Sequence, residues 1–378
     1  GFKNTDLVKI LFAENPGIVV QVADEDRSKF KNILDEAGVG YLKLGKPTDE
    51  RHILVSYEDK TYHFGIDYLR DVWYETSYLL DTKQSFNGQA SARFTNYKKQ
   101  PVEFSYNKNF TGKLSQYGIS PERRTPSGIR AAIIREKGTN GEREMAYVLY
   151  LAGFDVKDVM MTDLISGRET LDDINMIVFC GGFSNSDVLG SAKGWAGAFL
   201  YNPKAKAALE RFYAREDTLS LGVCNGCQLM VELNLINPEQ KERARMLHNV
   251  SGKFESAYLG LTVQTNRSVM LGSLSGSKLG VWVAHGEGRF SLPLPEDQYN
   301  IVLKYTYDEY PGNPNGSDYA TAGICSADGR HLAMMPHPER AFYPWQCATY
   351  PLQRKEDEVT PWIEAFVNAR QWVESHKK

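Results

Sequence analysis

Between Ile129 and Cys224, short apolar runs alternate with longer segments of helical periodicity. The apolar runs are IRAAIIR, FDVKDVM, INMIVFCGG and TLSLGVC, and the helical segments include EREMAYVLYLAG and the residues around Lys204 to Arg215. Such alternation places successive strands parallel in one sheet, with the connecting helices on its two faces. The sequence therefore predicts an α/β fold with a mainly parallel sheet flanked by helices.

The segments on either side of this region have a different character. Residues 16–22 and 52–56 form β-rich runs, and a helical pattern around Ser28 to Ala37 lies between them, which predicts a small α+β piece. The stretch from Leu80 to about Ser127 is polar and rich in turn-forming residues. After Val250 the pattern consists of short strands and loops, and a helix is expected near the C-terminus, around Pro361 to Val373.

These patterns predict a division of the chain into an N-terminal domain at 1–105, a linker at 106–127 and an α/β domain at 128–378. A length of 378 residues agrees with two domains, because single cores seldom grow beyond about 250 to 300 residues. There are no internal repeats and no low-complexity tracts.

Composition narrows the classes of partner. The net charge of -3 provides no polybasic surface, so a nucleic-acid partner is not expected. No apolar run approaches the ~18 residues that span a bilayer, so a membrane is not expected either. The opening GFKNTDLVKI lacks the pattern of a signal peptide, and the five cysteines are too scattered for a disulfide scaffold. A reducing cytoplasmic environment is the expectation.

A nucleophile elbow is predicted at residues 219–230, LSLGVCNGCQLM, where an apolar strand leads into Gly222-Val223-Cys224-Asn225-Gly226 and then a helical run. The glycines leave room for neighbouring backbone at a tight strand-to-helix turn. Cys224 would project into a cleft, and its place at a helix N-terminus favours the reactive thiolate.

Three other interpretations of Cys224 remain open at this point. The residue can be a buried small hydrophobe, as free cysteines often are. Cys224 and Cys227 form a C-x-x-C pair that also suits a redox site at a strand-to-helix junction. A zinc site is the weakest of these, because no second C-x-x-C or H-x-x-x-H supplies further ligands, and no metal is expected.

A base and its orienting carboxylate are predicted in HLAMMPHPER. The prolines at 336 and 338 oppose a helix and favour an extended backbone at His337. In an extended segment residues two apart point the same way, so Glu339 can fix the tautomer of His337. A single histidine is more often structural, but His-x-Glu together with a cysteine elbow supplies the partners that a cysteine nucleophile requires.

An oxyanion hole is predicted where the strand INMIVFC runs into a Gly-Gly-Phe-Ser loop. Backbone N–H groups from Gly182 or Phe183, and from Asn225, are the candidate donors. The loop alone would equally suit an ordinary turn at a strand end. Gln228 lies four residues after Cys224 on the same side of the predicted helix, where it can bind a polar group of a substrate or serve packing.

The motifs G-V-C-N-G-C-Q and P-H-P-E resemble those of class I (triad) glutamine amidotransferases. The segments CGGFSNSDVLGSAKGW, LGVCNGCQLM, HNVSGKFE, AHGEGRF, YPGNPNGS and MMPHPER are similar to the narrower family of large single-chain formylglycinamide ribonucleotide amidotransferases. This resemblance runs from about residue 128 to the C-terminus. The part before it, including FGIDYLRDVWYETSYLLD, is similar to the end of that family's synthetase half, a domain like aminoimidazole-ribonucleotide synthetase.

The resemblance implies a C-terminal fragment of a longer polypeptide that hydrolyses glutamine through a Cys224 thioester, with His337 and Glu339 as its triad partners. Ammonia would pass to synthetase domains of the same polypeptide, which make formylglycinamidine ribonucleotide for purine biosynthesis. ATP and Mg²⁺ are expected in that synthetase part, and no cofactor in this chain.

The resemblance also places other residues at the site. It implies that Phe254 and Glu255 line the glutamine site and that His285 lies near the cleft or a domain interface. The segment SNSDVLGSAKGW departs from the family's SYGDVLGAGEGW, so Asn185, Ser186 and Lys193 are expected to alter loop stiffness or ammonia entry.

Two rival functions remain from the sequence. A γ-glutamyl hydrolase or cysteine peptidase on the same fold would release glutamate from peptides, but would leave the N-terminal synthetase-like piece unexplained. An inactive, regulatory glutaminase-like domain would be favoured if the elbow cysteine or the His-x-Glu were missing, and both are present.

Overall fold

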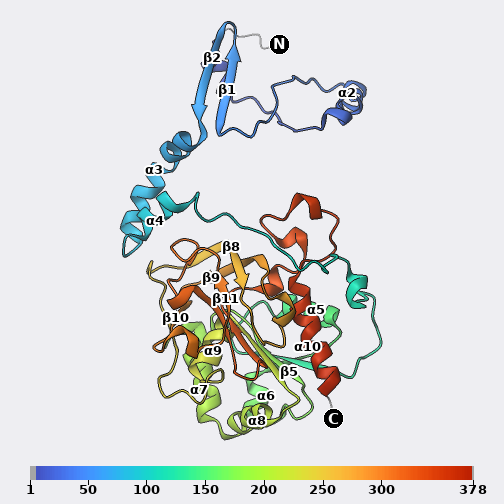
Figure 1. Ribbon diagram of the computed structural model, residues 1–378, viewed down its shortest axis with the longest axis vertical. Coiled ribbons are helices and arrows are strands. Elements are labelled where there is room, and N and C mark those ends of the chain that lie inside the picture. Colours follow the sequence, from blue (N-terminus) through green and yellow to red (C-terminus); the bar gives the residue numbers. More distant parts are fainter. Residues whose placement is uncertain (1–5, 377–378) are drawn as a thin grey trace. The chain divides into compact units, whose positions relative to one another are not determined.

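The computed structural model describes residues 6–376 (Figure 1). The chain divides into two compact units, Gly1–Thr76 and Ser77–Lys378. The boundary lies within one continuous helix, α3 (Ile66–Gln84). This division follows the density of contacts within the chain and does not test where one family domain ends and the next begins. The domain limits at 105 and 127 that the sequence suggested therefore stay predictions.

The first unit contains a β-hairpin and short helices. Its elements are α1 (Leu7–Leu11), a 3₁₀ turn (Asp24–Asp26), α2 (Arg27–Glu36), β1 (His52–Tyr57) and β2 (Lys60–Gly65). The predicted helix near 28–37 and the predicted strand at 52–56 are confirmed. The predicted strand at 16–22 is wrong. Ile18 and Val19 are 90% and 81% exposed, and no strand within residues 6–376 pairs with them to satisfy a β-ladder.

The second unit is built on a nine-stranded sheet with the order β4-β3-β5-β6-β13-β12-β11-β8-β9. In chain order these strands are β3 (Arg130–Arg135), β4 (Asp155–Met160), β5 (Met176–Phe179), β6 (Leu219–Val223), β8 (Glu255–Val263), β9 (Lys278–His285), β11 (Ile301–Tyr305), β12 (Thr321–Cys325) and β13 (His331–Met334). A separate pair joins β7 (Arg245–Leu247) to β10 (Arg289–Ser291).

The sheet has a parallel half and an antiparallel half. The pairings from β4 through β13 are parallel, and those from β13 through β9 are antiparallel. Strands β5 and β6 lie in the parallel half and are buried along their whole length, which accounts for their continuous apolar sequences. The predicted α/β class is confirmed, and the antiparallel half corresponds to the short strands expected after Val250.

Helices cover both faces of the sheet, as the alternating sequence predicted (Figure 1). On one side α5 packs against α10, and on the other α7 packs against α8 and α9, while α6 packs against α8. These helices are α5 (Glu142–Ala152), α6 (Met161–Ser166), α7 (Lys193–Tyr201), α8 (Pro203–Ala214), α9 (Asn225–Glu232) and α10 (Trp362–His376). The core between the layers is large and apolar, which supplies most of the stabilisation of such a fold.

Part of the stretch from Leu80 to Ser127 is helical, which its turn-rich sequence did not predict. Helix α3 continues to Gln84, and α4 (Gln89–Asn96) follows after a short turn. Ala90 and Asn96 of α4 are buried within the second unit, so tertiary contacts outweigh the weak local propensity. Within residues 6–376, no helix is long and apolar enough to cross a membrane.

Candidate active site at the nucleophile elbow

Cys224 occupies a sharp turn between β6 and α9. Its backbone has φ 52° and ψ -106°, which is an unfavourable conformation for a residue with a side chain. The backbone N–H of Cys224 donates to the carbonyl of Met334, 2.9 Å away on the neighbouring strand β13. Strain of this kind persists only where the surrounding structure imposes it, and it is concentrated at functional sites.

The two glycines of the elbow are required by close backbone contacts. A Cβ on Gly226 would lie 2.0 Å from the carbonyl oxygen of Phe179, and one on Gly222 would lie 2.5 Å from the carbonyl oxygen of Gly226. Real Cβ atoms do not approach backbone this closely. The turn can therefore hold Cys224 against the end of β5 only if both positions lack side chains, as the sequence predicted.

The Cys224 side chain lies in a narrow space between two strand ends. Its Sγ is 3.5 Å from the carbonyl oxygen of Ala284 on β9, and the residue is 5% exposed. A Cβ added to Gly181, at the end of β5, would lie 3.3 Å from the Cβ of Cys224 and 2.8 Å from the Cε1 of His337. Gly181 thus lies against the side chains of both Cys224 and His337.

His337 and Glu339 form a buried pair beside this point. Nδ1 of His337 is 2.6 Å from Oε1 of Glu339, and both side chains are almost inaccessible to solvent. The backbone N–H of His337 donates to the carbonyl of Trp282 on β9 at 2.9 Å. The predicted proximity of the two residues is therefore present, and Glu339 is placed to orient the imidazole ring.

The backbone is extended at His337, which forms an antiparallel bridge with Trp282 as the prolines suggested, but it does not stay extended through Glu339. Pro338–Arg340 form a single 3₁₀ turn that begins directly after His337. Pro338 is accommodated because it stands in the first position of the turn, where its missing N–H costs no hydrogen bond. The turn, and not an extended backbone, brings the side chain of Glu339 back toward Nδ1 of His337.

The charges around His337 favour its protonated form. Burial alone would lower the pKa of the imidazole, but the adjacent Glu339 carboxylate and the Cys224 side chain outweigh burial and raise it to about 9. Nδ1 of His337 is taken by Glu339, which leaves Nε2 as the ring nitrogen available to Cys224. At neutral pH this ring can hold a proton beside Cys224.

The three backbone N–H groups predicted for the oxyanion hole differ in whether they are already hydrogen-bonded. The N–H of Phe183 donates to the carbonyl of Gly138 at 2.8 Å, so it is engaged in this conformation. Within the described chain, the N–H groups of Gly182 and Asn225 donate to no protein acceptor, and Asn225 is the first residue of α9. The geometry therefore favours Gly182 with Asn225 over Phe183 as donors to an oxyanion.

The side chains of Asn225 and Gln228 join the elbow helix to its surroundings. Asn225 accepts from the N–H of Ser184 at 3.1 Å and donates to Oε1 of Gln228 at 2.9 Å. Nε2 of Gln228 donates to the carbonyl of Glu287 at 2.7 Å. Both ends of the Gln228 amide are thus occupied, which corresponds to the packing role that the sequence left open for this residue.

The residues assigned to a glutamine site by resemblance gather where β8 meets β9. Phe254 is exposed, and its ring centre is 6.0 Å from that of Phe183. Glu255 is buried and pairs with His285 across the two strands. Burial, with the nearby charge of His337, lowers the pKa of His285 to about 3, so this histidine is neutral.

The segment from the loop after β5 to the start of α7 carries Asn185, Ser186 and Lys193, the three departures from the family pattern that the sequence analysis singled out. Asn185 and Ser186 have φ values of 52° and 57°, in the left-handed region that glycine adopts most easily. Ala192, which the sequence analysis did not single out, also has a positive φ of 59° where the family pattern has glycine. Lys193 begins α7. Side chains at these left-handed positions add local backbone strain.

Two other interpretations of Cys224 lose support. Cys227 is fully buried, burial raises the pKa of its thiol well above the ordinary range, and it is not disulfide-bonded to Cys224. A thiol in that state is a poor redox partner. The described residues contain no group of three or more His, Cys, Asp or Glu side chains that could hold a metal ion.

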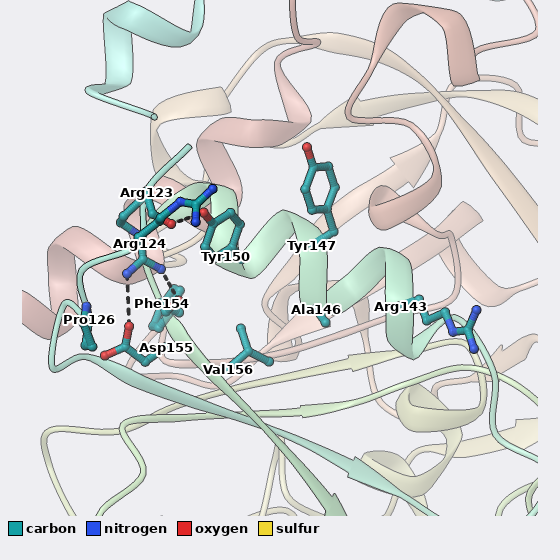
Figure 2. Close-up of a pocket in the computed structure, with 10 residues that line it drawn as sticks. All are labelled: Arg123, Arg124, Pro126, Arg143, Ala146, Tyr147, Tyr150, Phe154, Asp155 and Val156. Atoms are coloured by element: carbon teal, nitrogen blue, oxygen red, sulfur yellow. Dashed lines mark hydrogen bonds and ion pairs between the residues drawn. The ribbon is translucent and has the colours of Figure 1, made fainter. Parts of the chain in front are cut away.

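An open pocket of about 540 Å³ lies elsewhere, against α5 and the start of β4 (Figure 2). Arg123 donates to Oδ1 of Asp155 at 3.1 Å and to the carbonyl of Phe154 at 2.7 Å, and it lies over the ring of Tyr150. These contacts fasten the segment before β3 to β4. None of the predicted site residues lines this pocket.

Sequence reasoning missed several groups at the elbow. The carbonyl of Ala284 and the backbone of Gly181 approach Cys224 closely, although the sequence analysis gave neither residue a role at the cysteine. Arg93 reaches the Glu255 carboxylate from α4, more than 160 positions away in the sequence. No local signal identifies such groups, because their roles depend on which segments the fold brings together.

A strained cysteine elbow on an α/β sheet, with a buried His–Glu pair beside it, defines the class of amidotransferase-like α/β proteins. Residues 128–373 match the model of the CobB/CobQ-like glutamine amidotransferase domain. The chain therefore belongs to this glutamine amidotransferase family.

The chain is also similar to much longer proteins. It is 39% identical over 398 residues to phosphoribosylformylglycinamidine synthase of Homo sapiens, and the match covers 97% of this chain and 29% of that protein. It is 39% identical over 394 residues to the probable chloroplastic/mitochondrial enzyme of that name from Arabidopsis thaliana, covering 98% of this chain and 27% of the other. The chain thus spans less than a third of these relatives.

Among solved structures, a chain of PurLQS from Thermotoga maritima is similar. It is 28% identical, with a TM-score of 0.48, and the match covers 66% of this chain and 99% of that one.

Proposed function

We propose that this chain hydrolyses glutamine through a thioester on Cys224 and supplies the ammonia to synthetase domains of the same polypeptide. The observation that carries the proposal is the placement of Cys224 beside the buried pair of His337 and Glu339, whose charges favour a protonated imidazole. A thiolate and an imidazolium side by side are the reactants that cleavage of an amide requires.

The first half of the reaction forms the thioester. The Cys224 thiolate attacks the side-chain carbonyl carbon of glutamine, and the carbonyl oxygen becomes an oxyanion that accepts from the free N–H groups of Gly182 and Asn225. The His337 imidazolium transfers its proton to the departing nitrogen, so ammonia leaves as the carbon–nitrogen bond breaks. Glu339 keeps the imidazole in the orientation that directs Nε2 toward the reacting atoms.

The second half regenerates the enzyme. Neutral His337 takes a proton from a water molecule as that water attacks the thioester carbon. Collapse of the second tetrahedral intermediate breaks the carbon–sulfur bond, releases glutamate and restores the thiolate beside the imidazolium. Each turnover therefore consumes one glutamine and one water and yields glutamate and ammonia.

The acceptor of the ammonia is part of the same proposal. The relatives are named phosphoribosylformylglycinamidine synthase, and this chain corresponds to less than a third of their length. We infer that the remaining polypeptide holds ATP and Mg²⁺ and converts formylglycinamide ribonucleotide to formylglycinamidine ribonucleotide in de novo purine biosynthesis. ATP would activate the amide oxygen, and ammonia would displace phosphate. The scattered free cysteines favour a cytoplasmic location.

The rival functions predict different behaviour. A γ-glutamyl hydrolase or cysteine peptidase would release glutamate from γ-glutamyl peptides and would need no synthetase domains. An inactive regulatory domain would form no thioester although its elbow is complete. The match to a synthase covers 97% of this chain and so extends through the N-terminal unit, which the peptidase interpretation leaves unexplained. This coverage favours the amidotransferase.

The experiment measures glutamate release with and without ATP and formylglycinamide ribonucleotide, on this chain and on the full-length polypeptide. We expect weak hydrolysis by this chain, which the two ligands do not change, and stimulated hydrolysis in the full-length form. A ligand shifts an equilibrium between two conformations only if it binds one of them more tightly, and the binding sites for these ligands are expected in the other domains. Strong stimulation of this chain alone would contradict the assignment of ATP binding to other domains. Hydrolysis of γ-glutamyl peptides in preference to glutamine would favour the rival.

A further inference from the structure

Residues of α3, α4 and the turn between them, all before residue 128, contact the segment that carries Phe254 and Glu255. The turn between α3 and α4 is fastened to the segment that precedes β8. The N–H of Phe86 donates to the carbonyl of Ser251 at 2.9 Å, and Nδ2 of Asn87 donates to the carbonyl of Val250 at 2.8 Å. This segment runs directly into Phe254 and Glu255, so the turn before α4 fixes the chain from which these two side chains project.

Arg93 on α4 is the centre of the cluster. Its Nη2 is 3.0 Å from Oε2 and 3.3 Å from Oε1 of Glu255, and its Nη1 is 3.5 Å from Asp81. Lys253 donates to the other oxygen of Asp81 at 2.5 Å. Two acids and two bases thus balance in charge, with both carboxylates largely buried.

Glu255 is held in one orientation by donors on two sides. The hydroxyl of Tyr310 donates to its Oε1 at 3.0 Å, and the guanidinium of Arg93 lies 5.1 Å from the centre of the Tyr310 ring. Burial raises the pKa of the Glu255 carboxyl, and a hydrogen bond from Ser251 and the charges of Arg93 and Lys253 oppose that rise.

The position of Glu255 relates it to the elbow. It pairs with His285, and paired residues of antiparallel strands project on the same side of the sheet. His285 is close enough to His337 for their charges to interact, and the adjacent residue Ala284 offers its carbonyl to the Cys224 thiol. The face that carries Glu255 is therefore the face on which the predicted nucleophile and base lie.

We infer that Arg93 is a positioning residue of the glutamine site, holding the Glu255 carboxylate charged and oriented to receive the α-ammonium group of glutamine. This inference rests on the proposed glutaminase function and deepens it. Its consequence is that the substrate site is incomplete within residues 128–373, because α4 lies before that segment and supplies the cation that supports Glu255.

The test uses the whole chain and 6-diazo-5-oxo-L-norleucine, an electrophile with the amino-acid end of glutamine. Alkylation of Cys224 is followed by mass spectrometry over a range of probe concentrations, for the wild type and for Arg93→Gln. We expect the half-saturating concentration to rise at least about tenfold, with the limiting rate changed less than about twofold, since only binding loses a charged partner. Arg93→Lys should recover part of the affinity.

Three controls separate positioning from a general structural effect. Alkylation by iodoacetamide, which lacks the amino-acid end, should proceed equally in the wild type and Arg93→Gln. The analogue 6-diazo-5-oxohexanoate, which lacks the α-amino group, should show no difference between them either. Arg211→Gln on α8, which removes an exposed ion pair with Asp172, should behave as the wild type with every probe.

The outcomes are distinct. Equal half-saturating concentrations for wild type and Arg93→Gln would overturn the inference while leaving the glutaminase proposal intact. Failure of the wild type to react with the glutamine analogue at Cys224 would instead overturn the glutaminase proposal itself. If Arg93→Gln does not fold, Tyr310→Phe decides, because it removes only the hydroxyl that donates to Glu255. A rise of about threefold in its half-saturating concentration is expected, and no rise would overturn the inference.

Discussion

The two halves of the sheet build their parts of the site by different means. In the parallel half, the strand-to-helix turn at Cys224 is fixed by backbone contacts, such as the approach of Phe179 to Gly226. In the antiparallel half, Glu255 is fixed by side chains that reach it from α4 and from the loop at Tyr310. Backbone contacts leave a local motif in the sequence, whereas long-range side-chain contacts leave none.

The comparison assigns different functions to the halves. We expect changes at the elbow and at His337, which follows the strand where the two halves meet, to alter the rate of the chemical steps. Changes around Glu255 should alter the binding of substrate. The predictions below test this division.

The largest effect is expected at the nucleophile. Cys224→Ser should abolish thioester formation and lower glutamine hydrolysis by at least about 10³-fold, because a hydroxyl at this position is a far weaker nucleophile than a thiolate. Cys227→Ala should retain most activity, since Cys227 lies on α9 with its side chain fully buried, where substrate cannot reach it. Rates of glutamate release from the two variants check the prediction, which is falsified if their behaviour is reversed.

The base and its orienting carboxylate should differ in importance. His337→Asn should lower hydrolysis by about 10³-fold, and Glu339→Gln by about 10- to 100-fold, because an orienting group is often less costly to lose than the base. Limiting rates at saturating glutamine measure both. Equal and complete loss in the two variants would contradict this ranking.

The backbone origin of the elbow is tested by glycine substitutions. Gly226→Ala should lower the free energy of unfolding by about 2–4 kcal/mol, because its Cβ would meet a carbonyl oxygen that cannot move freely. Gly197→Ala in α7 is the matched control, since the nearest side-chain atom would be 3.8 Å away. It should be neutral or stabilising by up to about 1 kcal/mol. Denaturant unfolding of both variants decides, and similar losses would argue against a backbone constraint at the elbow.

The smallest effect is a displacement of a pH profile. The pKa of His337 is raised to about 9, so the imidazolium is present below that pH and is lost above it. Glutamine hydrolysis should therefore fall as the pH rises through about 9. In Glu339→Gln the fall should begin at lower pH, because the carboxylate that favours the imidazolium is gone. An unchanged profile in this variant would show that Glu339 does not set the charge of His337.

The same shift has a consequence for stability. Because the folded-state pKa lies above the ordinary value of about 6.5, the stabilisation from charged His337 is complete below that value. It is lost as the pH rises through about 9.

Local patterns predicted much of the fold. The strands β3 to β6 and the helices α5 and α8 followed from periodicity, whereas α6 and α7 were not expected; the elbow followed from the two glycines around Cys224. The strand expected at residues 16–22 failed because a β-rich sequence forms a strand only with a partner. The helix α4 was missed because its stability depends on tertiary contacts within the second unit.

The candidate site was predictable to the extent that it depends on motifs. The approach of His337 and Glu339 to Cys224 was expected, although a 3₁₀ turn achieves it instead of an extended backbone. The choice between Gly182 and Phe183 as a donor was not predictable, because it depends on a hydrogen bond from Phe183 to Gly138. The contact of Arg93 with Glu255 likewise joins segments that no periodicity connects.

The central claim is that Cys224 is the nucleophile of a glutaminase. Its most direct test is to treat the chain with 6-diazo-5-oxo-L-norleucine and identify the labelled cysteine by mass spectrometry of the digested protein. We predict a single adduct on Cys224, which excess glutamine prevents from forming. An adduct on Cys227 or another cysteine, or labelling of Cys224 that glutamine does not suppress, would contradict the claim.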